Sequence, residues 1–327
     1  MSRVLRITAL LACAVAATAQ AQTASTAPGQ AFPWKTLRLV SGVSPGSASD
    51  TMARIISEKL QASLGQPVIV ENRIGGGGIV GAGSVAKADP DGHTISVYTS
   101  SFTMVPFRPN PPFDAPRDLA AVATLATIPN VLIVSPAKGW NTVQDLVAAA
   151  KAKPGQLTYG SAGVGTSTHM GAEKFRFAAG IEVVHVPYKG APEPIADIIG
   201  GRIDFNFAPI VATMGQIRDG RVKALAVGSA KRARALPDVP TTVEAGYPGS
   251  EYNFWVGLLV ASKTPRETVD RLNQEVNRVL QQPDVRDRIE KLGADVLVMP
   301  LPEFEAMIRQ EFEDNAKLVK AAGIKLE

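Results

Sequence analysis

The stretch TLRLVSGVSPGSASDTMARIISEKLQASL, residues 36–64, contains the pattern of a strand, a turn and a helix in direct succession. Residues 36–43 are mostly apolar, which is typical of a buried strand. In residues 50–64 the apolar side chains recur at helical spacing on one face, namely Met52, Ile55, Ile56, Leu60 and Leu64. The turn between the two consists of small and hydroxylated residues. A strand followed at once by an amphipathic helix is the repeating unit of an α/β sheet.

The same alternation continues to the end of the chain. The sequence predicts further strands at 68–71, 94–98, 131–135, 157–161, 182–186, 203–207 and 222–228, and helices at 79–88, 142–153, 264–281 and 303–322. Thr142 is expected to cap one of these helices, and Thr264 with Glu267 forms a capping-box pattern at another. We therefore expect an α/β protein with parallel sheets, and its length favours two sheets over one.

The composition is that of an ordinary globular protein. Of the 327 residues, 45% are hydrophobic and 20% are charged, which excludes a disordered chain. The formal charge is only +4 and no basic stripe accompanies it, so we expect no nucleic-acid partner. The single cysteine, Cys13, permits no disulfide within the chain.

The first 21 residues carry the marks of a secretory signal. Arg3 and Arg6 precede an apolar run at residues 7–17, and residues 19–21 (AQA) match a small-x-small cleavage site. Lipoprotein processing at Cys13 is the alternative, although it leaves a very short apolar run before the cysteine. Cleavage after Ala21 would leave a flexible leader, residues 22–34, and a mature chain that we expect in the periplasm. No later apolar run is long enough to be a transmembrane helix.

Three patterns resemble catalytic motifs, and each has a physical objection. Residues 42–46 (GVSPG) have the form of a nucleophile elbow around Ser44, but Pro45 lacks the backbone N–H that the oxyanion hole needs, and no histidine follows His185. Residues 76–81 (GGGIVG) have the form of a dinucleotide fingerprint, but the next strand ends without an acid to hold the ribose. Residues 84–87 (SVAK) lack the partner motifs of a serine acyl-enzyme. The three histidines lack metal-ligand spacing. We therefore expect no catalysis, no cofactor and no metal.

Two loops have a composition suited to holding an anion. Residues 44–50 (SPGSASD) and residues 160–169 (GSAGVGTSTH) each follow a strand, contain glycines and hydroxylated residues, and precede a helix. Backbone N–H groups at a helix N-terminus attract negative charge. We expect the N–H groups of residues 46–48 and 161–166 to converge on carboxylate oxygens, with Thr166 adding a hydroxyl. One such loop in each half of the chain suggests a ligand held between two lobes.

A series of short motifs makes the chain similar to a known family. They are PGSASD at 45–50, VENR at 70–73 with the glycines to 81, AKADPDGHT at 86–94, YGSAGVGT at 159–166, VPYKG at 186–190, GGRID at 200–204, LPDVPT at 236–241 and EAGYPG at 244–249. With these motifs in this order, the chain resembles, from about Trp34 to Glu327, the Bug-type extracytoplasmic solute receptors of tripartite tricarboxylate transporters.

The resemblance implies a periplasmic-binding-protein fold, type II-like, with two α/β lobes and a ligand cleft between them. The lobes would comprise residues 35–128 with 252–327, and residues 129–251. It also implies a monomer that captures a small carboxylate reversibly and delivers it to a membrane permease with a large and a small integral subunit. A ligand-sensing receptor that feeds a sensor protein is the alternative function, and a hydrolase using Ser44 is a third hypothesis.

From the two loops together with the resemblance, we expect the following ligand-binding residues: Ser44, Gly46, Ser47, Ala48, Asp50, Ser100, Ser161, Gly165, Thr166, His169, Tyr188, Asn206 and Phe207. The chain departs from the family pattern at two places. Ser47 stands where relatives have a second glycine, and residues 205–209 (FNFAP) lack the aspartate that many relatives carry after this strand. The second departure disfavours a ligand ammonium, so a non-amino dicarboxylate or an aromatic carboxylate is expected. For the latter, Phe102, Phe107 and Trp255 with Tyr188 and Phe207 would form an apolar wall.

Overall fold

A computed structural model describes residues 31–322 of the chain. The predicted signal segment 1–21, its alternative lipidation site at Cys13 and most of the predicted leader lie outside the described residues. Among the residues that are described, no helix combines the length and the apolar character that crossing a membrane requires.

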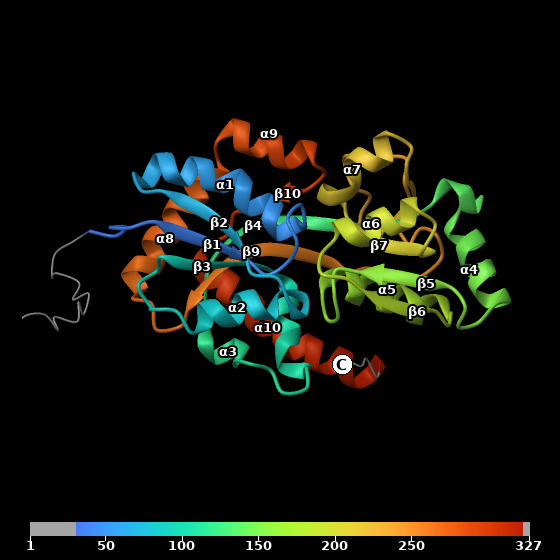
Figure 1. Cartoon of the computed structure of the whole chain (residues 1–327), viewed down its shortest axis with the longest axis horizontal. Helices are drawn as coiled ribbons and strands as arrows, with labels where there is room; N and C mark the ends of the chain where they lie inside the picture. Colours follow the sequence, from blue (N-terminus) through green and yellow to red (C-terminus); the bar gives the residue numbers. More distant parts are fainter. Residues whose placement is uncertain (1–30, 323–327) are drawn as a thin grey trace, which may run out of the picture.

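One mixed sheet runs through the protein. Its strands are β1 (Leu37–Ser41), β2 (Val68–Asn72), β3 (Thr94–Thr99), β4 (Leu119–Val134), β5 (Thr158–Ser161), β6 (Val184–Pro187), β7 (Phe205–Pro209), β8 (Lys223–Val227), β9 (Asn253–Ala261) and β10 (Asp295–Val296). Their order is β2-β1-β3-β9-β4-β7-β5-β6, and β8 and β10 also pair with β4. Figure 1 shows two bodies side by side, with β4 and β9 running from one toward the other.

The long strand β4 joins the two halves. Residues 119–129 pair with β9, whereas residues 130–134 pair with β7 and β8. Almost every residue of β4 is buried, because elements cover both of its faces. The pairs that involve β4 and β9 are antiparallel, whereas β1 pairs in parallel with β2 and β3, and β5 pairs in parallel with β6 and β7. The expectation of two parallel sheets is therefore wrong, since a shared strand makes one mixed sheet.

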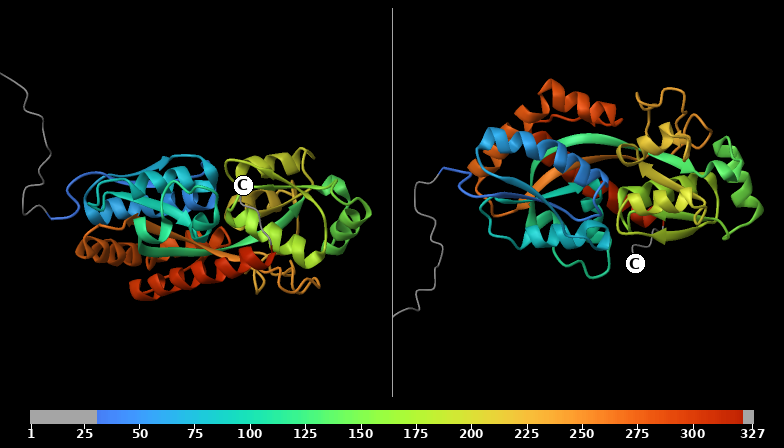
Figure 2. Two further views of the ribbon diagram at one scale, coloured as in Figure 1. Left: turned by 90° about the horizontal axis from the view of Figure 1, so that it is seen from below. Right: turned by 45° about the horizontal axis from the view of Figure 1, so that its top comes forward.

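Helices cover both faces of this sheet (Figures 1 and 2). They are α1 (Ala48–Leu64), α2 (Ile79–Ala86), α3 (Ala115–Asp118), α4 (Val143–Ala152), α5 (Ser167–Ala179), α6 (Pro192–Ile199), α7 (Ile210–Arg218), α8 (Arg266–Leu280), α9 (Pro283–Lys291) and α10 (Leu301–Ala322), with 3-10 turns η1 (Gly76–Gly78), η2 (Ser100–Phe107) and η3 (Pro136–Lys138). Thr142 caps α4 in a complete capping box with Asp145, as predicted. The second predicted cap is wrong, because the Thr264 hydroxyl donates to the carbonyl of Ala261 and no side chain caps α8.

The C-terminal helix α10 lies along one side of the molecule, below the sheet in the view of Figure 2 (left). The indole N–H of Trp255 on β9 donates to Glu311 on α10 at 2.7 Å. The Trp255 ring packs edge-on against Phe102 and Phe304, with ring centroids 6.0 and 5.0 Å apart. Trp255 and Phe102 therefore belong to the hydrophobic core between β9, η2 and α10, not to a ligand-facing wall.

Candidate ligand-binding site

A small cavity lies between the two halves, at the ends of the strands where the helices begin. Its volume is about 30 Å³, which holds a water molecule, so a larger ligand needs the two halves to stand slightly further apart than they do here. The first half contributes Val43, Ser47, Ala48, Ser49, Gly77, Tyr98, Thr99 and Ser101 to its lining, and the second half contributes Ala162, Thr166, Ser167, Thr168, Ala191 and Pro209. The structure therefore shows the two halves closed on each other.

Helices α1 and α5 both begin at this cavity, and their first turns are built alike. The N-cap residues Ser47 and Thr166 have nearly the same extended backbone, with φ −73° and ψ 166° against φ −74° and ψ 165°. Neither side chain caps its own helix. The Ser47 hydroxyl instead accepts the N–H of Ala191 at 3.0 Å, and the Thr166 hydroxyl donates to the carbonyl of Gly163 at 2.6 Å. The backbone N–H groups in the first turns of α1 and α5 are thus not capped by the hydroxyl of the N-cap residue.

The first turns of α1 and α5 contain backbone N–H groups without an intrahelical partner. The first intrahelical bonds are donated by Thr51 to Ser47 and by Met170 to Thr166. The N–H groups before these have no intrahelical partner: those of Ala48, Ser49 and Asp50 in α1, and those of Ser167, Thr168 and His169 in α5. Two helix N-termini of opposite halves therefore present free N–H groups and positive dipole ends to one cavity.

The N–H groups of the preceding loops are used differently from what the sequence predicts. In the second loop, Ala162 donates to the Thr168 hydroxyl, Gly163 to the Ser161 hydroxyl, Gly165 to Nδ1 of His169 and Thr166 to the carbonyl of Gly163. These bonds hold the loop in shape. The N–H groups of the first helical turns that are left without an intrahelical partner are those of residues 48–50 and 167–169, and of the predicted donors only that of Ala48 is among them.

A buried histidine, His169, and a half-buried one, His185, support the second loop. The rings of His169 and His185 stack with centroids 4.2 Å apart, and Nε2 of His185 lies 2.6 Å from the Ser161 hydroxyl. Burial and, to a smaller extent, the neighbouring His185 lower the pKa of His169 to about 3. Burial also lowers the pKa of His185 to about 4. Both rings are therefore neutral at physiological pH, and Nδ1 of His169 keeps the lone pair that accepts the Gly165 N–H at 3.1 Å. His169 positions the loop.

A buried carboxylate supports the first loop in the same way. Asp50 accepts hydrogen bonds from the Gly46 N–H at 2.8 Å, the Asn72 amide at 2.9 Å and the Arg54 guanidinium at 3.0 Å. Burial alone would raise the pKa of Asp50, but the hydrogen bonds from Arg54, Gly46 and Asn72 outweigh it and lower that pKa. The carboxylate is thus ionised, and it fixes the turn that leads into α1.

Direct contacts between the halves close the cavity on two sides. On one side, the Ser44 N–H donates to the carbonyl of Lys189 at 3.2 Å and its hydroxyl donates to Glu193 at 2.5 Å. On the other side, the Arg108 guanidinium donates to two carbonyls, Gly76 at 2.5 Å in its own half and Val164 at 2.7 Å in the other. Any opening of the cavity must break these contacts.

The remaining predicted site residues lie away from the lining. Ser100 is buried at the start of η2, and the Tyr188 hydroxyl donates to Asp197 at 2.5 Å. Phe207 packs in the core against Phe175 of α5, with centroids 5.4 Å apart. Asn206, the residue before Phe207 in β7, is also buried. Because side chains alternate along a strand, it faces the other side of the sheet from Phe207. Of the predicted residues, Ser47, Ala48 and Thr166 line the cavity.

Sequence analysis missed several lining residues. Ser49, Ser167 and Thr168 stand in the two loops that were singled out, and the rule that first-turn N–H groups are unpaired would have identified them. Gly77 lies in the run of four glycines, whose close approach to the other half only the tertiary structure shows.

Comparison with known proteins gives the family. Residues 52–324 match the family model of the tripartite tricarboxylate transporter family receptor. The chain belongs to this family. It is 40% identical over 265 residues to a UPF0065 protein encoded in the tcbD–tcbE intergenic region of Pseudomonas sp. strain P51, covering 80% of this chain and 79% of that one. It is 30% identical to the protein BugT of Bordetella pertussis, over 99% of this chain and 100% of that one.

Solved structures of relatives show the same fold. The periplasmic binding protein BugD superposes with a TM-score of 0.86 at 30% identity, over 90% of this chain and 99% of that one. An R. palustris protein with adipate gives a TM-score of 0.87 at 29% identity, over 90% and 99% of the two chains. MatC from Rhodopseudomonas palustris with bound malate gives 0.83 at 30% identity, over 86% and 98%. The chain therefore has the periplasmic-binding-protein fold, and the predicted family and fold class are confirmed.

Proposed function

We propose that the protein is a periplasmic receptor that captures a small aliphatic dicarboxylate between two lobes and delivers it to a tripartite permease in the membrane. The lobes would be residues 35–128 with 252–327, and residues 129–251, and the permease would have a large and a small integral subunit. The observation that carries the proposal is the opposed pair of uncapped first turns, in α1 and α5, at one cavity. N–H groups at helix N-termini bind carboxylate oxygens without a positively charged side chain.

The lining supports a non-amino acid as ligand. None of the residues that line the cavity in the described part of the chain is charged. An ammonium group would therefore find no carboxylate to pair with, and its desolvation would be unfavourable. Tyr98 is the one aromatic side chain in this lining, and its hydroxyl donates to the Gly77 carbonyl at 3.1 Å. This supports an aliphatic ligand over an aromatic one, in line with the adipate and malate held by two relatives.

The same geometry supports binding without catalysis. Ser44 is not part of the cavity lining, and that lining contains no histidine and no carboxylate that would act as a base. Among residues 31–322, no group of three histidine, cysteine, aspartate or glutamate side chains is placed to hold a metal ion.

We propose that the chain reaches the periplasm through the signal at residues 1–21.

A thermal-shift screen followed by calorimetry tests the function. Malate, adipate, citrate and benzoate are compared with glutamate as an amino-acid control. A ligand at 100 times its dissociation constant should stabilise the protein by about 2.7 kcal/mol. The proposal fails if no carboxylate shifts the melting temperature of the pure protein.

Proline substitutions at the first helical residue test the site itself. Ala48→Pro and Ser167→Pro each delete one free N–H, and proline is tolerated at this position because the N–H has no helical partner. Each charge-assisted hydrogen bond is worth ~1.5–3 kcal/mol, so we expect affinity to fall by roughly tenfold to a hundredfold. Arg266→Pro, at the first residue of α8, is the matched control and should bind normally. Normal binding by both cavity variants would place the ligand elsewhere.

A further inference from the structure

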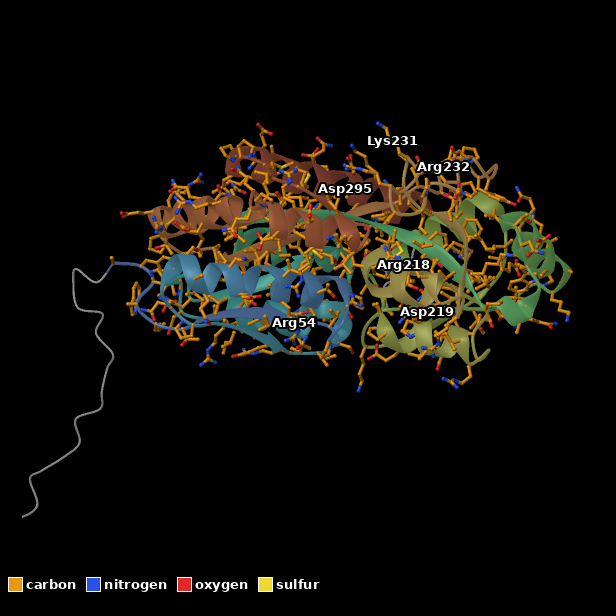
Figure 3. The ribbon with its side chains drawn as sticks, turned by 90° about the horizontal axis from the view of Figure 1, so that it is seen from above. Arg54, Arg218, Asp219, Lys231, Arg232 and Asp295 are labelled. Carbon is orange, nitrogen blue, oxygen red and sulfur yellow. The ribbon has the colours of Figure 1, made fainter. Side chains whose placement is uncertain are left out.

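A second hollow, open to solvent, lies beside the ligand cavity on the outer side of the first loop. Its volume is about 560 Å³. Its lining contains four cations, namely Arg54, Arg218, Arg288 and Lys291, and one carboxylate, that of Asp50. Leu292 contributes to the apolar part of the lining. Figure 3 shows Arg54 on α1 and Arg218 on α7 on either side of the line between the two halves. We call this feature the cationic groove.

The cationic groove has an excess of positive charge. Asp50 is 2% exposed and already bonds to Arg54, the Gly46 N–H and Asn72, so it neutralises only Arg54. Arg288 lies 4.0 Å from Glu58, and Lys291 lies 4.0 Å from Asp287, which are long distances for ion pairs. Among the described residues, no carboxylate lies within 4.0 Å of the Arg218 guanidinium. Of the three exposed cations that face the groove, Arg218 has no carboxylate within 4.0 Å in the described part of the chain, and Arg288 and Lys291 each have one only at 4.0 Å.

Both halves of the protein build the cationic groove. Arg218 ends α7 in the second half, whereas Arg288 and Lys291 stand at the end of α9, which packs on α1 in the first half. The Arg218 guanidinium reaches the carbonyl of Lys291 at 3.4 Å, across the boundary. The spacing of the cations thus depends on how the two halves are placed relative to each other. The size of the ligand cavity depends on the same placement.

We propose that the cationic groove is a docking surface for an acidic segment of a partner protein that recognises the closed form of the receptor. The groove is wide and open, and its polar side chains are exposed, which suits a polypeptide better than a small anion that needs enclosure. Complementary charge gives such contacts specificity and fast association. The identification of the partner as the permease rests on the proposed function. The acidic nature of the docking segment follows from the groove itself.

The other large hollow is a poorer candidate. It has a volume of about 620 Å³, and its lining contains the cations Lys35, Arg38, Arg73 and Lys87 and the carboxylates Asp89 and Asp91. Lys35 pairs with Asp91 at 2.7 Å, and Arg38 and Arg73 pair with Glu71 at 3.2 and 2.9 Å. Three of its four cations therefore have a carboxylate within 3.2 Å, and the hollow belongs to one half alone.

A labelled acidic peptide tests the proposal. The probe is a fluorescent dodecapeptide of alternating Glu and Ala, with an analogue carrying Gln for Glu as the uncharged comparison. Binding is measured by anisotropy at low and high salt, with and without malate or adipate. The groove variants are Arg218→Glu in the second half and the double variant Arg288→Glu with Lys291→Glu in the first. Lys151→Glu on α4 and Lys263→Glu before α8 are exposed control variants with the same charge change per residue.

We expect the Glu peptide to bind the wild-type protein, and both groove variants to bind it at least about tenfold more weakly than the controls do. Salt should weaken binding by screening the charges. A dicarboxylate that closes the halves should strengthen peptide binding, and by linkage the peptide should strengthen dicarboxylate binding by the same factor. No peptide binding, equal loss in the control variants, or binding of inorganic phosphate in place of the peptide would each overturn the proposal.

Calorimetry with malate and adipate on the same variants separates this proposal from the proposed function. Unchanged dicarboxylate affinity with lost peptide binding supports the docking surface. If the wild-type protein binds neither malate nor adipate but the peptide result holds, the choice of ligand fails and the docking surface stands.

Discussion

Gly77→Ala should hold the two halves apart while leaving each half folded. Gly77 has φ +65° and ψ 29°, a left-handed conformation, and it lies in the run of glycines that faces the second half. A Cβ at this position would lie 2.8 Å from the carbonyl oxygen of Val164 and 2.9 Å from Cγ2 of Thr166. Both atoms belong to the other half, so the added methyl group acts on closure more than on folding.

The structure also sets the size of the effect. Left-handed backbone costs alanine about 1–2 kcal/mol whether the halves are open or closed. Overpacking of the two cross-cavity contacts costs about 1–3 kcal/mol more, and only in the closed form. Since ligand affinity falls with the population of the closed form, we expect binding to weaken by roughly fivefold to a hundredfold.

Gly76→Ala is the matched control for this variant. Gly76 has φ +56°, so alanine there meets the same backbone cost, but its Cβ would first meet Cβ of Ile79, at 3.4 Å within the same half. Both variants should melt at similar temperatures without ligand. Calorimetry should show weakened binding only for Gly77→Ala, and small-angle scattering should show a larger radius of gyration for it. Equal affinities in the two variants would refute the argument that Gly77 is a closure contact.

Three further predictions follow from the buried and bridging groups. Burial raises the pKa of Glu311 to about 7 from an ordinary 4.5. Its stabilising contribution is therefore complete below about pH 4.5 and is lost as pH rises through 7. The free energy of unfolding of the wild-type protein should fall by roughly 2 kcal/mol between pH 5.5 and 8 because of this group, and Glu311→Gln should abolish that fall in denaturant unfolding. Burial lowers the pKa of His185 to about 4, so its contribution is present above the unfolded pKa of about 6.5 and is lost as pH falls toward 4; His185→Gln should flatten that acid limb in thermal melts, and an unchanged limb would assign it to other groups. Arg108→Lys should lose the fork that donates to Gly76 and Val164, and stopped-flow measurements should show faster ligand release at similar stability; an unchanged rate would mean that this bridge does not hold the closed form.

Local patterns in the sequence predicted much of the architecture because local interactions decide it. The helix at 50–64 follows from its apolar face, and the cap at Thr142 follows from hydrogen bonds within four residues. Strand β4 shows the limit of such patterns. Its first part, residues 119–129, is rich in alanine and contains Pro129, so its extended form comes from pairing with β9. Strand β9 itself is a short apolar run, which periodicity alone does not separate from a buried helix.

The sequence by itself determined that two donor-rich loops precede helices and that the chain is an α/β receptor of this family. Only the tertiary structure decided which N–H groups are free. The Ser47 hydroxyl turns away from its own helix because Ala191, 144 residues along the chain, donates to it. Whether a hydroxyl caps its own helix or bonds to the other half depends on the partners that folding brings near. The two arrangements differ in free energy by about the contribution of one hydrogen bond. For the same reason, the closure contacts at Gly77 and Arg108 exist only once both halves are in place.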